Sequence, residues 1–339
     1  TGDKSVSVDS LQGSGTSASD PKLIYNGAQL YAAVNSNTAT YFKLMRDIEL
    51  QVPDNMSKID ALLDGGTDNE GLNNWDVSST FMGHFDGNFK TISGLYLNAT
   101  STKGFFAALG AGASISNLTV KDSVYKSTGA VAALIGKIGG AGSTGVTISG
   151  CRVENCRIET TANVAAGFIG NLFTSKVTLT NCAFVMGEKG YMSSANSNNC
   201  AAIYGDHWAN NANSGYGTTI NTFLSLGQYP ARDEVWDASS GTPFLVNLST
   251  VYTDISNSSD RFTRLTTAEL TGTNAYNLVF KPENGWIVLA EGAAPVYVGA
   301  ENVDKYDYLP VRIPIDDLQG TGLSAATPKR IYTAEELMI

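Results

Sequence analysis

The sequence predicts an all-β chain, a right-handed parallel β-helix with short α/β capping segments at both ends. An apolar motif that recurs along the middle of the chain predicts this fold, and a 17-residue segment that occurs twice predicts that the fold is one unit of a tandem array. Composition agrees with them. Charged residues make up only 16 % of the 339 residues, while Gly, Ser, Thr and Asn are abundant. Such a composition is typical of turn-rich β-structure with a neutral polar surface.

The apolar motif places apolar residues at positions i, i+3 and i+5. It begins at residues 92, 115, 148, 179 and, more weakly, 220, with spacings of 23, 33, 31 and 41 residues. Self-similarity on this scale is typical of a solenoid. A step of three breaks strand alternation, so one residue must be absorbed in a bend. The steps contain Gly or Asn, which tolerate a left-handed backbone. Each segment therefore predicts two short strands that meet at a corner.

A second motif of small residues precedes most corners. We expect each copy to form a short strand ending at a glycine, and the small side chains to let neighbouring strands pack closely. The four copies are GFFAALG (104–110), VAALIGK (131–137), VAAGFIGN (164–171) and CAAIYGD (200–206).

The two ends of the chain differ from the middle. Asn26 is expected to cap a short helix that carries Leu30, Tyr31 and Val34, followed by a strand over 41–50. Thr266 or Thr267 is expected to cap a second helix within 265–298. Because a β-helix exposes strand edges at both ends, both segments are interpreted as caps.

The repeated segment sets the predicted domain organisation. Residues 9–25 and 316–332 are identical at eleven of seventeen positions without a gap. We therefore expect one unit of a tandem array: an inter-unit linker over 1–20, a capped β-helix over 21–302, a linker over 303–327, and the start of a truncated next unit over 328–339. This last segment is expected to dock on the unit's C-terminal end or on a neighbouring chain.

The sequence resembles the GLUG-motif β-helix proteins of bacterial surfaces, the adhesin-like repeat proteins of Bacteroidetes. Their usual opening is matched by Ile24-Tyr25 to Leu30, then by Tyr41-Phe42-Lys43-Leu44 and Asp47-Ile48-Glu49-Leu50, and their next element by residues 81–95, where Phe89 replaces the usual Gly. The closing Gly285-Trp286 and Ala294-Pro295-Val296-Tyr297 also fit, so the resemblance covers roughly residues 21–300. It implies the fold and leaves the function open.

Candidate binding residues are few. Asp206-His207-Trp208 follows a repeat position and suggests a site in an inserted loop, and an exposed Trp75 could stack on a sugar. In an adhesin, the loops at 54–80 and 186–216 would carry the ligand. The alternative for all of these residues is local packing beneath a loop.

Two further groups invite a chemical interpretation. Asp64, Asp68 and Glu70 concentrate carboxylates in one stretch and are a weak calcium candidate, although their spacing does not match a known calcium loop. Cys151 and Cys182 occupy equivalent repeat positions. We expect these two, and also Cys156 and Cys200, to be free, buried, slow-reacting thiols.

The remaining observations bound the function. The net charge of −10 disfavours nucleic acid, and no apolar run is long enough for a membrane span. No catalytic motif or cofactor is expected. The predicted function is a non-catalytic module of a secreted or cell-surface bacterial repeat protein, adhesive or a stiff spacer, whose partners are a surface or host glycan or protein and adjacent units. The alternative is a β-helix that binds or degrades polysaccharide. In that case the polysaccharide would bind on the charged face formed by Arg152, Glu154, Arg157 and Glu159.

Overall fold

The computed structural model describes residues 4–139, 145–162, 164–173, 176–195, 200–208, 217–228, 246–255 and 262–310. Two compact units divide the chain, Thr1–Leu265 and Thr266–Ile339. The boundary thus falls near residue 265, earlier than the predicted end of the first unit at 302. The two units are described separately below.

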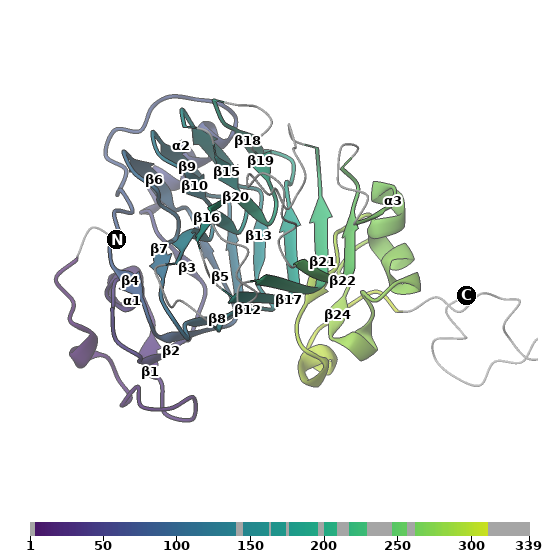
Figure 1. Cartoon of the computed structure of the whole chain (residues 1–339), viewed down its shortest axis with the longest axis horizontal. Coiled ribbons are helices and arrows are strands. Elements are labelled where there is room, and N and C mark those ends of the chain that lie inside the picture. Colours follow the sequence, from purple (N-terminus) through teal and green to yellow (C-terminus); the bar gives the residue numbers. More distant parts are fainter. Residues whose placement is uncertain are drawn as a thin grey trace, which may run out of the picture. The chain divides into compact units, whose positions relative to one another are not determined.

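The first unit is mostly β-structure and is built around one large parallel sheet (Figure 1). Along the sheet the strands are ordered β1 (Lys22–Ile24), β2 (Tyr41–Leu44), β5 (His84–Ser93), β8 (Ser114–Lys121), β12 (Val146–Ser149), β17 (Lys176–Val185), β21 (Gly217–Leu226), β22 (Val246–Thr253) and β23 (Thr263–Arg264). In addition, β3 (Ile48–Glu49) pairs with β5, and β13 (Arg152–Glu154) pairs with β8 and β17. The predicted strand over 41–50 is therefore two strands, β2 and β3.

Three smaller parallel sheets accompany the large one. After β8 the chain passes through one strand of each smaller sheet before it returns to the large sheet as β12, and it repeats this order up to β20. The first small sheet holds β6 (Tyr96–Ala99), β9 (Val124–Ser127), β14 (Arg157–Thr160) and β18 (Tyr191–Ser193). The second holds β10 (Val131–Ala132), β15 (Ala165–Ala166) and β19 (Cys200–Ala201), and the third holds β4 (Thr80–Phe81), β7 (Phe106–Leu109), β11 (Ile135–Ile138), β16 (Ile169–Phe173) and β20 (Tyr204–Trp208).

The small-residue motifs supply every strand of the second small sheet and all strands of the third except β4. The prediction of one strand per motif is wrong for the last three copies, because each is split into two strands that belong to different sheets. Close packing explains the small residues. A Cβ on Gly136 would lie 2.7 Å from the Ala107 carbonyl oxygen, and one on Gly170 would lie 2.6 Å from that of Gly136.

The corners of the large sheet lie where the apolar motif places them in four of the five segments. Residues with left-handed φ stack at successive corners: Asn117, Gly150, Asn181, Thr222 and Thr250, with φ between 53° and 60°. The fifth segment is out of register, because Ile92 pairs with Val120 and Phe85 is the partner of Ile115. The motif at residue 92 therefore belongs to a second corner, which contains the left-handed Gly94, Asp122 and Asn155.

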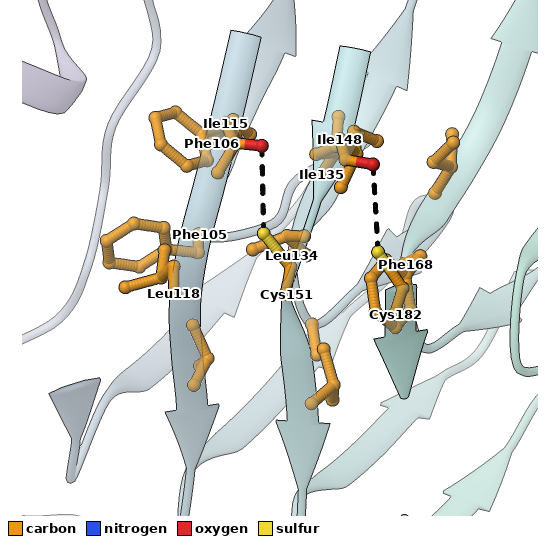
Figure 2. Close-up of a cluster of buried hydrophobic side chains, with 14 of the residues drawn as sticks. Phe105, Phe106, Ile115, Leu118, Leu134, Ile135, Ile148, Cys151, Phe168 and Cys182 are labelled. Atoms are coloured by element: carbon orange, nitrogen blue, oxygen red, sulfur yellow. Dashed lines mark hydrogen bonds between the residues drawn. The ribbon is translucent and has the colours of Figure 1, made fainter. Parts of the chain in front are cut away.

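An apolar core lies between the sheets and continues from strand to strand. Ile115, Ile148, Leu179 and Ile220 are in register and fully buried. Cys151 and Cys182 lie one corner further on, beside Leu118, and their thiols approach the carbonyl oxygens of Ile115 at 3.8 Å and Ile148 at 3.7 Å (Figure 2). The four cysteines are free and buried, as predicted.

Two helices belong to the first unit. α1 (Gly27–Val34) begins at Asn26, whose side chain accepts a hydrogen bond from the Gln29 amide, as predicted. α2 (Pro53–Leu63) was not predicted, and it occupies part of the expected binding loop at 54–80. Its residues Ile59, Leu62 and Leu63 pack with Tyr96 and Val124, so this stretch contributes to the core rather than to a free loop.

The segment expected to be an N-terminal linker is packed rather than extended. It contains a short 3-10 helix, Val8–Ser10, and Leu11 is buried in the main core cluster. The glycines that follow allow the chain to turn back into β1, with φ of 94° at Gly13 and 76° at Gly15.

The second unit is small and begins with α3 (Thr267–Leu270). Thr266 forms the predicted cap, a reciprocal capping box with Glu269. β24 (Trp286–Ile287) and β25 (Val296–Tyr297) form an antiparallel pair, and 3-10 helices lie at Gly272–Asn277, Pro282–Asn284 and Ala300–Lys305. Val303, expected in a linker, is buried with Ile287 and Val298. The predicted next-unit segment, 328–339, lies outside the described residues.

Candidate functional site

Three of the candidate binding residues named from the sequence lie on β20. Asp206, His207 and Trp208 lie beside Asn171, Leu172 and Phe173 of β16 in the third small sheet. The structure describes the backbone at these three positions and not their side chains, so the prediction of a ligand site here stays a prediction. The rest of the expected loop at 186–216 is partly outside the described residues.

Trp75 is not exposed, which corrects the expectation that it could stack on a sugar. Only 6 % of the residue is accessible, and its Nε1 donates a hydrogen bond of 2.8 Å to the Phe105 carbonyl oxygen. Its ring stacks on Phe105 at 5.2 Å and meets the edge of Tyr31 at 5.5 Å. For Trp75 the alternative interpretation, local packing instead of ligand binding, is therefore the correct one.

Two of the three carboxylates considered for calcium, those of Asp64 and Asp68, are engaged by lysines, and the backbone carbonyl oxygen of Glu70 accepts from Lys58. Asp64 pairs with Lys189 at 3.0 Å, and Asp68 pairs with Lys58 at 3.3 Å. The Glu70 amide and Lys58 both donate to Asp68 and lower the pKa of its carboxyl. Among the residues that the structure describes, no group of three or more His, Cys, Asp or Glu side chains is placed to hold a metal.

The charged residues proposed for an enzymatic face are paired with one another. Arg152 contacts Glu154 at 2.6 Å, and Arg157 contacts Glu159 at 2.8 Å. The guanidinium of Arg157 also lies 4.5 Å from the ring centre of Tyr191. The four charges therefore neutralise one another in two pairs.

The outer face of the large sheet carries two continuous rows of polar side chains. The rows arise because every second residue of a strand points away from the core. Most of their members are small hydroxyl or amide side chains, but the members on β5 and β2 are aromatic or charged. One row is Tyr41, His84, Ser114, Thr147, Thr178 and Thr219, and the other is Lys43, Asp86, Ser116, Ser149, Thr180 and Asn221.

A groove of about 250 Å³ lies where the character of the rows changes. Its floor is the outer face of β2, β5 and β8, and Ala18 and Pro21 of the N-terminal segment form one wall. The polar side chains that line it are Tyr41, Lys43, His84, Asp86, Ser114, Ser116 and Asn117. Along the described part of the two rows, aromatic and charged side chains lie next to each other only at this groove.

The groove side chains are held by contacts across the strands. The Tyr41 and His84 rings stack with centres 4.3 Å apart and planes at 27°, and His84 Nδ1 lies 2.9 Å from Ser114 Oγ. Lys43 Nζ lies 3.4 Å from Asp86 Oδ2. Asp86 Oδ1 also accepts from the Asn88 amide at 2.8 Å. These contacts bring the polar groups of the groove together in the absence of a ligand.

This arrangement offers a defined chemistry. A carboxylate, an ammonium, two hydroxyls and an amide lie around a pair of stacked rings. Hydrogen bonds that involve a charged partner are stronger and shorter than neutral ones, and aromatic rings present flat apolar area. A ligand with many hydroxyls and an apolar face, such as a sugar ring, can use both features.

The groove residues are not among the candidates predicted from the sequence, although the sequence contains a signal for them. Tyr41-Phe42-Lys43 and His84-Phe85-Asp86 both alternate polar and apolar residues, which predicts that each pair of polar side chains shares one face. In the structure His84 lies at the start of β5, opposite Tyr41 of β2.

Comparisons with known proteins leave the family open. No protein-family model and no curated protein matches the chain. Among solved structures, the chain is similar to one described as a putative immunoglobulin A1 protease from Bacteroides ovatus, with 14 % identity and a TM-score of 0.47. That match covers 88 % of this chain and 97 % of the other. No helix within the described residues is long and apolar enough to cross a membrane.

Proposed function

We propose that the first unit is a right-handed parallel β-helix and that it serves as a glycan-binding, non-catalytic module of a bacterial secreted or cell-surface repeat protein. The recurring order of sheets supports the solenoid, because each pass through the large sheet and the smaller sheets equals one coil. The repeated segment and the resemblance to bacterial surface proteins support the tandem array and the extracellular location.

The groove over β2, β5 and β8 carries this proposal. It joins an aromatic pair, Tyr41 and His84, to the charged pair Lys43 and Asp86, whereas the members of the two polar rows on β8, β12, β17 and β21 are neutral. The apolar ladder beneath keeps the strands in register and makes the face rigid. Weak binding by one groove would gain avidity when many units are joined in one chain.

A glycan array tests the proposal directly. We expect the wild-type chain to bind at least one class of glycan. Asp86→Asn is expected to weaken that binding by about 10-fold or more, because charge-assisted hydrogen bonds contribute about 1.5–3 kcal/mol. Tyr41→Ala should have a similar effect.

Thr180→Ala is the matched control, because Thr180 belongs to the same row as Asp86, beyond the groove. Its binding should stay within about twofold of wild type. A second variant, Trp208→Ala, tests the site suggested by the sequence. Loss of binding in Trp208→Ala with unchanged binding in Asp86→Asn would place the site on β20 and contradict the groove.

The alternative activities have distinct outcomes. A stiff spacer would show no glycan binding in any variant. A polysaccharide-degrading enzyme would release reducing ends or unsaturated products from mixed polysaccharides. In that case His84, whose Nδ1 lies 2.9 Å from Ser114 Oγ, is the residue to replace first. We expect no product release from the wild-type chain.

A further inference from the structure

The N-terminal segment is seated on the edge of the large sheet by a few buried residues. We call residues 9–25 the opening segment and residues 316–332 its second copy. β1 of the opening segment pairs in parallel with β2 through Lys22–Phe42 and Ile24–Leu44. Ile24 is fully buried and Leu11 nearly so. The opening segment thus fills a defined position beside β2.

Backbone hydrogen bonds fix the opening segment to its neighbours and do not depend on side chains. The Tyr41 amide donates to the Gly15 carbonyl oxygen at 2.9 Å, and the Met45 amide donates to that of Ile24, also at 2.9 Å. One side-chain bond lies within the opening segment, where Lys22 Nζ donates to the Leu11 carbonyl oxygen at 3.1 Å. Any segment that places its glycines and its lysine in the same way can form these bonds.

The second copy keeps every residue that this position requires. The buried residues of the opening segment are Leu11, Gly15 and Ile24, and each is identical in the second copy, as Leu318, Gly322 and Ile331. The six positions that differ are all exposed or half-buried: Ser10, Ser14, Thr16, Ser19, Asp20 and Leu23.

The glycine at position 13 is a particularly strict requirement. Its φ is +94°, and a Cβ there would lie 1.9 Å from the Pro21 carbonyl oxygen. The second copy has Gly320 at this position and Pro328 at that of Pro21. Residues that merely form a surface linker would not need this combination, because exposed loops tolerate most side chains.

The helix start that follows is also preserved. Asn26 accepts from the Gln29 amide, and Gln29 Oε1 accepts from the Tyr25 amide at 2.7 Å. The corresponding residues 333 and 336 are Thr and Glu, a standard capping-box pair. Leu30, fully buried in α1, corresponds to Leu337.

We propose that the β2 edge is a docking site for segments of this type and that the second copy of one molecule docks there on a second molecule of this chain. The second copy then replaces the opening segment of its partner and joins the two molecules head to tail. In the wild-type chain the opening segment competes from within the same molecule, at an effective concentration of about millimolar. Docking between molecules therefore becomes strong when the opening segment is disabled.

The test uses the full chain with Gly13→Val, which disables the opening segment and leaves the second copy intact. We expect concentration-dependent dimers and longer oligomers by sedimentation velocity, with the wild-type chain mostly monomeric at the same concentration. The double variant Gly13→Val/Gly320→Val is the matched control and should return to the monomer. A synthetic peptide of residues 313–339 should bind Gly13→Val and dissociate its oligomers, and the same peptide with Gly320→Val should not.

Circular dichroism and a cooperative thermal transition establish that Gly13→Val is folded. If it is not, Gly15→Ala replaces it, since a Cβ there meets a side-chain atom, Thr40 Cγ2 at 2.6 Å, rather than the backbone, a milder conflict. A folded variant that stays monomeric and does not bind the peptide would overturn the proposal. Equal binding of both peptides would also overturn it, because docking would then not depend on the glycine.

Discussion

The two faces of the large sheet use the same strands in different ways. The inner face presents buried apolar residues from β2 to β21, from Phe42 and Phe85 through Ile115 to Ile220. The two polar rows of the outer face change along the sheet, from hydroxyl and amide side chains on β8 to β21 to rings and charges on β2 and β5. The constant face stabilises the fold, and the face that changes is where a binding site can be placed.

Removal of an inner side chain is expected to have the largest effect. Ile148 is fully buried and lies between Ile115 and Leu179. Ile148→Ala should lower the free energy of unfolding by about 2–5 kcal/mol, because it removes apolar contacts and leaves a cavity. The measurement is chemical denaturation followed by circular dichroism.

Thr147→Ala is the outer-face control, one residue away. Because Thr147 is exposed, the change should stay within about 0.5 kcal/mol of wild type. Equal losses in Ile148→Ala and Thr147→Ala would remove the distinction between the two faces.

The corner residues give a smaller effect of opposite sign. Thr222 has a left-handed φ of 59°, which is costly for a β-branched residue. Thr222→Gly should relieve about 1–2 kcal/mol of backbone strain and so stabilise the fold. The variant also loses the hydrogen bond to Thr250 at 2.9 Å, which reduces this gain. Thr219→Gly, in the same strand but outside the corner, should instead destabilise by about 1 kcal/mol. If both variants lose the same stability, the corner is not strained.

The buried thiols predict a pH dependence with a definite sign. Burial raises the pKa of Cys182 from 9.0 to about 12, so the folded chain keeps this proton over a range in which the unfolded chain loses it. Stability from this group is fully present below pH 9 and is lost as pH rises from about 9 to 12. The slope is at most about 1.4 kcal/mol per pH unit.

Cys182→Ala should therefore show a flatter decline of the denaturation midpoint between pH 8 and 10.5 than the wild-type chain. The cavity left by the missing thiol lowers the stability of the variant by the same amount at every pH, so it does not affect the comparison of the two slopes. In the native chain at neutral pH, all four thiols should react slowly with a thiol reagent, and identical slopes together with rapid labelling would contradict their burial.

Features with a strong local cause could be predicted from the sequence. The corners in the segments that begin at residues 115, 148 and 179 depend on Asn or Gly in a left-handed conformation, while the segment that begins at 220 has Thr222 in this place. The caps at Asn26 and Thr266 depend on a side chain bound to a nearby amide. These causes lie within a few residues, so the sequence displays them.

Features that depend on distant contacts could not be predicted in the same way. The motif at residue 92 matched the apolar pattern, but only pairing with Val120 shows that it belongs to the second corner. Trp75 is buried by Phe105 and Tyr31, which are remote in sequence. The groove likewise requires three strands and the N-terminal segment to be brought together.

Amide hydrogen exchange with and without a bound glycan tests the central claim most directly. We predict slower exchange in residues 41–44, 84–88 and 114–118 in the presence of the best ligand from the array, and no change in residues 176–182 of β17. Protection confined to residues 200–208, or no glycan bound at all, would contradict the assignment of the groove as the binding site.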